Sequence, residues 1–267
     1  IKMNKLPYLS TLLIGLCIFQ LSYSQDSSAC MQDLSIFAEY VKVKNYDAAI
    51  EPWIKVRENC PDLNAAIYTY GERIIKNNIK NGNVDLVESS KKELIKLYDE
   101  WIQYFPKNKN KAVIGDVLGK KAQALLDYKM ADLKKIYSTF DEAFTKDATS
   151  FTNPKFLYNY FKTLYDLYKS GDNQVSMEML INKYEEVSEK FDLETVSLAK
   201  KLDIILKKED EGKPLTSREQ RRKRIYNVNS KAIGTYLSNL DAIIAKEATC
   251  ENLIPLYKRN FEEFKED

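Results

Sequence analysis

The strongest constraint on the fold is a series of helix-length segments that end at widely spaced prolines. Pro61, Pro106 and Pro154 are separated by 45 and 48 residues, and the segments between them carry apolar residues at helical spacing around turns. Alternating runs of Val, Ile and Thr, which are typical of strands, are missing from the sequence, and Gly (8) and Pro (7) are scarce beside Tyr (18) and Phe (11). The sequence therefore predicts an all-α fold built from consecutive helical hairpins.

The first predicted hairpin spans residues 30–61, with a tight turn at Lys44 and Asn45. Its segment KNYDAAIEPWIKVRENCP resembles the second half of a tetratricopeptide repeat. Small residues in such a repeat allow two helices to approach closely, while bulky ones fill the gap to the next repeat. Phe37 departs from the small residue expected at the eighth repeat position. The positions that match are Asp33 (fourth), Ile36 (seventh), Tyr40 (eleventh), Ala49 (twentieth), Trp53 (twenty-fourth) and Pro61 (thirty-second).

Three further hairpins follow, and Gly71 falls on the eighth position of the second repeat. Together they extend the predicted repeat region over residues 25–191. Residues 192–248 are expected to add terminal or connecting helices around a charged Gly and Pro break. The predicted helices are residues 64–81, 84–105, 111–127, 129–146, 154–169, 174–191, 193–208 and 217–246.

The whole pattern resembles the tetratricopeptide superfamily, and more loosely the Cys-started tetratricopeptide-like envelope proteins of Gram-negative bacteria. This resemblance implies a solenoid, a right-handed superhelix whose first helices line a concave groove that accepts peptides or protein segments. The alternative for each groove position is plain surface or packing. Carried over by position, the groove residues are Leu34, Ala38, Val41, Lys42, Tyr68, Glu72, Ile75, Lys76, Asp116, Lys120 and Gln123.

The first 24 residues have the pattern of a secretory signal peptide. Lys2 and Lys5 precede an apolar run over residues 12–21, and Ser22 and Ser24 supply small residues before a predicted cleavage after Ser24. A retained anchor is the alternative, although the run is short for a membrane span, and no stable span is expected after cleavage. The resemblance then places the protein in the periplasm or outer envelope of a Gram-negative bacterium. Cleavage removes two of 41 bases and none of 39 acids, and the neutral remainder argues against nucleic-acid binding.

The cysteines support an oxidising compartment. Cys30 begins the first predicted helix and Cys60 ends the second, and these ends are neighbours in an antiparallel hairpin, so a disulfide is expected there, with two unlinked thiols as the alternative. Closing a loop of this length contributes about 3 to 4 kcal/mol. Cys250 begins a stretch that resembles the start of another repeat, so residues 250–267 are predicted to be its truncated first part.

Motifs for catalysis are weak. The sequence has no His, which removes the commonest general base and metal ligand, and we expect no metal, no cofactor and no enzymatic site. Residues 115–120 (GDVLGK) superficially resemble a phosphate loop, but packing of small residues is the favoured interpretation. The basic run at residues 217–224 is dense enough to suggest nucleic acid or an acidic membrane surface, but the predicted signal peptide and the acidic block at residues 209–211 favour a solvated helix face.

Two classes of function follow from the sequence. The first is an exported scaffold that binds a protein or peptide partner through the groove, in envelope assembly or secretion. The second is the front part of a larger envelope enzyme or adhesin whose activity lies beyond residue 267.

Overall fold

The computed structural model describes residues 1–267 except for 1–27, 109–110, 255–257 and 259–267. The predicted signal peptide, its cleavage site at Ser24 and most of residues 250–267 therefore lie outside the described residues. The described residues are almost entirely helical, which confirms the all-α class; the two short strands β1 (Lys107–Asn108) and β2 (Lys111–Ala112) pair with each other. Within this part of the chain, no helix is both long and apolar enough to cross a membrane.

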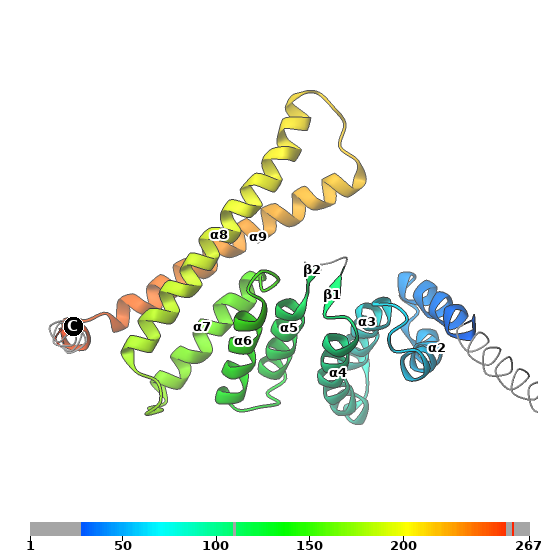
Figure 1. The fold of residues 1–267 in the computed structure, drawn as a ribbon, viewed down its shortest axis with the longest axis horizontal. Helices are drawn as coiled ribbons and strands as arrows, with labels where there is room; N and C mark the ends of the chain where they lie inside the picture. The colour runs from blue at the N-terminus through cyan, green and yellow to red at the C-terminus, as the bar shows by residue number, and fades with distance from the viewer. Residues whose placement is uncertain (1–27, 109–110, 255–257, 259–267) are drawn as a thin grey trace, which may run out of the picture. The chain divides into compact units, whose positions relative to one another are not determined.

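The chain divides into two compact units, Ile1–Lys111 (unit 1) and Ala112–Asp267 (unit 2), each built from helices that pack against their neighbours in sequence (Figure 1). The described part of unit 1 consists of helical residues 28–42, α2 (Tyr46–Asn59), α3 (Ala66–Asn81) and α4 (Val84–Tyr104). Unit 2 contains α5 (Ile114–Asp127), α6 (Leu133–Asp147), α7 (Pro154–Lys169), α8 (Met177–Asp210) and α9 (Ser217–Glu247).

Most helices begin where a short polar side chain caps the first turn. The side chains of Asn45, Asn83, Asp132 and Ser176 each accept a hydrogen bond from a backbone N–H at the start of α2, α4, α6 and α8. Thr216 begins α9 with a capping box in which Glu219 returns the bond. Because these caps need only neighbouring residues, they explain why sequence patterns predicted most helix starts within a few positions.

The predicted helix break after Phe191 is wrong, because α8 runs without interruption from Met177 to Asp210. No Gly or Pro occurs at this point in the sequence to stop the helix. Instead, the buried side chains of α8 recur at intervals of seven and four residues, which is the spacing of a helix that keeps one face against its neighbours. These residues are Leu180, Val187, Phe191, Leu198 and Ile205.

Close contacts between large and small residues determine how the helices fit together. In unit 1, the fully buried core includes Tyr68 and Tyr98, and a Cβ atom at Gly71 would lie 2.7 Å from the Trp53 indole. In unit 2, a Cβ atom at Gly119 would lie 2.6 Å from the Phe156 ring. Glycine at these two positions is what allows neighbouring helices to approach around an aromatic side chain.

Candidate functional site

Five of the eleven predicted groove residues lie in the packed core, so their assignment to a partner-binding surface is wrong. Leu34, Val41, Tyr68, Ile75 and Gln123 are at most 8% exposed. The reason is clearest in residues 28–42, where Cys30, Leu34, Phe37 and Val41 recur every three or four residues and form the buried face. The alignment to the tetratricopeptide repeat placed this buried face one residue too early in the sequence. It therefore assigned residues of the buried face to the groove.

The other six predicted groove residues are partly or fully exposed, but their charges are paired within their own helices. Lys42 pairs with Glu39 at 2.6 Å, Lys76 with Glu72 at 2.6 Å, and Lys120 with Asp116 at 3.3 Å. Ala38 is half-buried and contributes no charge. Four of the six belong to unit 1 and two to unit 2. Whether they line a groove stays a prediction.

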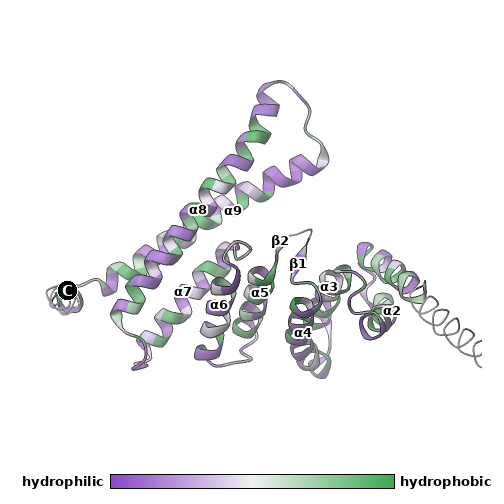
Figure 2. Ribbon diagram, viewed as in Figure 1, coloured by the Kyte–Doolittle hydropathy of each residue, from purple (hydrophilic) through white to green (hydrophobic). Residues whose placement is uncertain are grey.

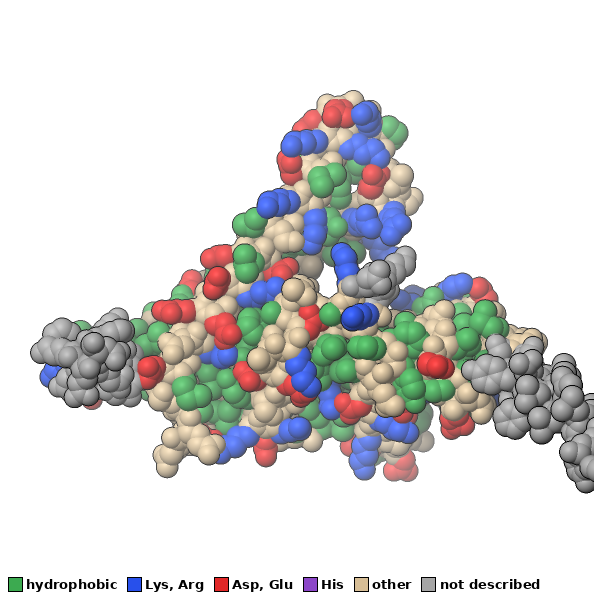
Figure 3. Space-filling view, in the orientation of Figure 1, with side chains coloured by type: hydrophobic (Ala, Val, Ile, Leu, Met, Phe, Trp, Pro, Cys, Tyr) green, Lys and Arg blue, Asp and Glu red, His purple; other side chains and the backbone are tan. Residues whose placement is uncertain are grey.

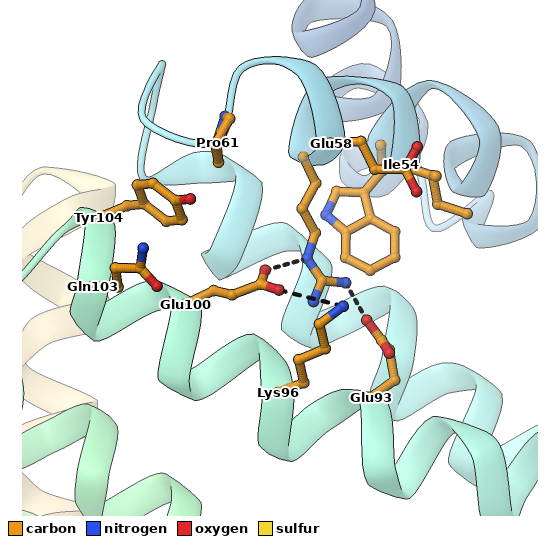
Figure 4. A pocket seen from close by; sticks show the side chains of 10 residues that line it. Ile54, Glu58, Pro61, Glu93, Lys96, Glu100, Gln103 and Tyr104 are labelled. Carbon is orange, nitrogen blue, oxygen red and sulfur yellow. Dashed lines mark hydrogen bonds and ion pairs between the residues drawn. The ribbon is translucent and has the colours of Figure 1, made fainter.

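A separate hollow lies between α2 and α4, which are the second helices of the two hairpins of unit 1. Its volume is about 560 Å³, and Figure 4 shows the side chains of both helices pointing into it. The indole N–H of Trp53 donates to the carbonyl oxygen of Ile67 at 2.8 Å, which fixes the ring against α3. The residues that line the hollow are Trp53, Ile54, Arg57, Glu58, Pro61, Glu93, Lys96, Glu100, Gln103 and Tyr104.

Arg57 is the central charged group of this hollow. Its side chain is only 9% exposed and joins the two helices, because Nη1 donates to Glu93 at 2.5 Å and Nε donates to Glu100 at 2.7 Å. Its guanidinium also lies 5.1 Å from the centre of the Trp53 ring. Lys96 lies 3.6 Å from Glu100, and dashed lines in Figure 4 mark these interactions.

The electrostatics of Arg57 suit binding rather than proton exchange. Burial alone would lower the pKa of Arg57, but the hydrogen bonds and charges of Glu100 and Glu93 outweigh it, and the pKa is raised. The guanidinium therefore stays charged and holds both carboxylates in fixed positions. Its Nη2 atom is buried and has no hydrogen-bond partner among the described residues. Such an unsatisfied donor costs free energy, which a water molecule could recover.

The rim of the hollow is apolar and acidic. Ile54 is 40% exposed, and Tyr104 and Pro61 form the side nearest the end of α4. Glu58 is exposed, and no ion pair to it is found among the described residues. Three carboxylates against two cations leave the lining with one excess negative charge. This combination can hold a segment that carries an apolar side chain beside a positive charge.

The sequence analysis did not predict this hollow, although the spacing of residues in the sequence contains a signal for it. Trp53 and Arg57 are four residues apart on α2, and Glu93 and Glu100 are seven apart on α4, so each pair shares one helix face. The two faces meet only through the packing of α2 and α4 on α3, because Arg57 lies 36 and 43 residues from its two partners in sequence.

Two further sequence predictions are confirmed. Cys30 and Cys60 form a disulfide with an S–S distance of 2.06 Å, whereas Cys250 is a free, exposed thiol. The packing interpretation of residues 115–120 also holds, since a Cβ atom at Gly115 would lie 2.1 Å from the carbonyl oxygen of Asp147.

In the described part of the chain, no group of three or more His, Cys, Asp or Glu side chains is arranged to hold a metal ion.

No protein-family model matches the chain, and no curated protein is significantly similar to it in sequence. A functional assignment therefore depends on the residues and their geometry. The hollow between α2 and α4 is the best-formed candidate site, because it combines apolar walls, a fixed ion network and a carboxylate that no described cation neutralises.

Proposed function

We propose that this chain is an exported protein-binding scaffold of the tetratricopeptide-like type, and that the hollow between α2 and α4 holds a segment of its partner. The observation that carries the proposal is the hollow itself, with apolar walls around a rigid ion network. Its volume is large enough to hold several side chains of a partner, and its rim is open to solvent. The exposed side of the first helices of the two hairpins, which carries Lys42 and Lys76 and which we call the first-helix face, is the alternative contact surface.

The packing of unit 1 supports the tetratricopeptide-like part of the proposal. With Leu34 as the fourth repeat position, the seventh, eighth and eleventh become Phe37, Ala38 and Val41, which removes the misfit of a large residue at the eighth. Ala49 and Trp53 keep their twentieth and twenty-fourth positions if the turn before α2 is one residue shorter than in the standard repeat. The indole of Trp53 lies directly against Gly71, as expected for a bulky residue that fills the gap to the small eighth position of the next repeat.

The disulfide supports export. Cys30–Cys60 closes a segment of 30 residues and joins the start of the first described helix to the end of α2. The cytosol is reducing and keeps thiols free, whereas disulfides of this kind persist in oxidising compartments outside it. Together with the basic and apolar pattern of residues 1–24, the bond is consistent with a role in the periplasm or on the cell envelope.

The charge of the hollow defines the partner segment. Glu58 is positioned to pair with a Lys or Arg side chain, and Ile54 and Tyr104 offer apolar contact beside it. We therefore expect a partner segment in which a basic residue lies near a Leu, Ile, Met or aromatic residue. Binding should weaken as salt is raised, because Glu58 is exposed to solvent.

A random peptide library displayed on phage tests the proposal directly. The purified chain should enrich peptides with the basic and apolar pattern, and synthetic copies should lose about tenfold in affinity to an Ile54→Asp/Glu58→Lys variant. The matched control is Lys42→Ala/Lys76→Ala, which alters exposed residues of the first-helix face.

Three results would count against this assignment. Failure to enrich any peptide would contradict the scaffold function of the chain as described. Peptides that lose affinity only to the Lys42 and Lys76 variant would move the site to the first-helix face. Peptides that bind both variants as tightly as the unmodified chain would exclude both surfaces. Circular dichroism of each variant establishes that the helices remain intact.

A further inference from the structure

The end of the α8–α9 hairpin is the most strongly charged part of the chain. Residues 200–224 carry ten Lys or Arg against five Asp or Glu, while the rest of the chain carries 31 against 34. Figure 1 shows this end of the hairpin projecting away from α7 within unit 2, and Figure 2 shows hydrophilic residues concentrated on the first half of α9. Figure 3 shows Lys and Arg side chains gathered over the same end. The positive charge is therefore localised rather than spread over the molecule.

Nearby acids do not neutralise the arginines of this segment. Glu209 pairs with Lys223, Glu211 pairs with Lys213 at 2.7 Å, and Glu219 pairs with Lys208 at 2.9 Å. Asp203 pairs with Lys207 at 2.8 Å, so four of the five acids of residues 200–224 are paired with lysines. No ion pair is found, in the part of the chain that the structure describes, for the exposed side chains of Arg218, Arg221, Arg222 and Arg224.

Apolar side chains share the surface with these arginines. Arg218, Arg221, Ile225 and Val228 follow one another at intervals of three, four and three residues, so they lie on one face of α9. Arg222 and Arg224 lie at the two edges of this face, and we call the whole surface the arginine face. Ile225 is 45% exposed and Val228 is 60% exposed. The first buried residue of α9 is Ile233, so the part of the helix that carries this face contributes no buried side chain. A solvated helix surface would not require aliphatic residues at these positions.

We propose that the arginine face binds an anionic membrane surface. The arginines would pair with lipid phosphates, while Ile225 and Val228 enter the boundary between headgroups and acyl chains, as in interfacial amphipathic helices. Aliphatic rather than aromatic residues on this face favour lipid over single-stranded nucleic acid, which stacks its bases on aromatic rings. The site lies in unit 2, so it is separate from the proposed peptide-binding hollow of unit 1, and either proposal can fail alone.

Co-sedimentation of the full chain with lipid vesicles tests this proposal. Vesicles of phosphatidylcholine are compared with vesicles that also contain about 30% phosphatidylglycerol, at low and high salt. We expect the anionic vesicles to bind the chain more tightly, and salt to reduce the difference. Replacement of Arg221, Arg222 and Arg224 by Gln should weaken this binding about 100-fold, which corresponds to about 1 kcal/mol for each charge.

Matched variants separate the effect of the arginine face on vesicle binding from the effect of net charge. All variants share residues 1–27, so these residues cannot account for a difference between variants. Lys80→Gln/Lys92→Gln/Lys135→Gln removes the same number of exposed charges elsewhere and should retain most of the binding. Ile225→Ser/Val228→Ser should weaken binding about tenfold by removing the apolar contact. Its control is Val43→Ser/Val84→Ser, which alters two other highly exposed residues and should have little effect.

Several outcomes would overturn the proposal. Equal loss from the arginine and lysine triple variants would show that net charge alone matters. Equal binding to both kinds of vesicle would exclude recognition of anionic lipid. A third outcome would assign the arginine face to an acidic protein. In that case the chain would bind polyglutamate as tightly as it binds anionic vesicles, and the Ile225→Ser/Val228→Ser variant would lose no binding.

Discussion

The two units of the chain use polar side chains in opposite ways. In unit 1, Arg57 and its carboxylate partners line an open hollow, and Glu58 at the rim remains available. In unit 2, the hydroxyl of the fully buried Tyr160 donates to Asp141 and accepts from Lys183, so this polar group joins α6, α7 and α8 from within. Burial, together with the hydrogen bond to Asp141, raises the pKa of Tyr160 and keeps the hydroxyl protonated. In unit 1 the polar groups therefore line an open hollow, whereas this cluster in unit 2 is enclosed and holds helices together.

A second polar cluster in unit 2 has the same structural character. The Asp147 carboxylate accepts hydrogen bonds from the backbone N–H of Gly115 at 3.3 Å and from the Thr149 hydroxyl at 2.6 Å. It thereby links the end of α6 to the start of α5, where unpaired backbone donors would otherwise remain. Burial opposes ionisation, but the bonds from Ser150, Thr149 and Gly115 outweigh it and lower the pKa of Asp147.

The largest expected effect is truncation of the aromatic core of unit 2. Phe151 is fully buried and its ring lies near those of Phe140, Phe144, Phe156 and Tyr160. Phe151→Ala should lower the free energy of unfolding of unit 2 by about 3 to 5 kcal/mol, because a large cavity remains. Peptide-resolved hydrogen exchange should show the loss of protection in α6 and α7. A loss of less than about 1 kcal/mol would contradict the packing described for this core.

The corresponding change in unit 1 is removal of its disulfide. Replacement of Cys30 and Cys60 by Ser should lower the stability of unit 1 by about 3 to 4 kcal/mol, because the unfolded chain gains conformational freedom. Both tryptophans, Trp53 and Trp101, belong to unit 1, so fluorescence during denaturation reports this unit. Cys250→Ser is the control and should change nothing, since that thiol is exposed and free. An unchanged fluorescence midpoint in the double variant would refute a stabilising role of the bond.

A smaller effect is expected from the ion network that distinguishes the two units. Arg57→Met should destabilise unit 1 by about 2 kcal/mol, because Glu100, whose side chain is 21% exposed, loses the nearer of its two partners in the hollow. Lys96→Met is the matched control and should cost about 0 to 0.5 kcal/mol, since its side chain is 66% exposed and its ion pair is long. Tryptophan fluorescence during urea denaturation measures both. Equal effects would show that Arg57 does not organise the hollow.

The smallest effect concerns the start of α9. Lys208 and the N–H and hydroxyl groups of Thr216 lower the pKa of Glu219 to about 2. Because the folded carboxyl has the lower pKa, its stabilising contribution is complete above the unfolded pKa of about 4.3 and is lost as pH falls to about 2. Carboxyl-carbon NMR should show Glu219 titrating below the other exposed glutamates, and Glu219→Gln should remove the pH dependence of capping. Titration of Glu219 at the pH typical of exposed glutamates would disprove the capping box in solution.

The sequence by itself determined the features that need only neighbouring residues. Helical periodicity predicted the all-α class, the caps at Asn45, Asn83 and Asp132 follow from short polar residues, and the hairpin brings Cys30 near Cys60. The periodicity and the caps act over one or two turns of helix, and the disulfide requires only a single hairpin, so no knowledge of packing between hairpins is needed.

Tertiary structure alone decided which helix faces are buried and where a hollow forms. Leu34, Val41 and Tyr68 were predicted to face a groove, yet their neighbours enclose them, because a shift of one residue turns a helix by about 100°. The meeting of Arg57 with Glu93 and Glu100 likewise depends on α2 and α4 packing on α3. Burial is a property of the surrounding helices rather than of a residue's own segment, and a local pattern therefore cannot specify it.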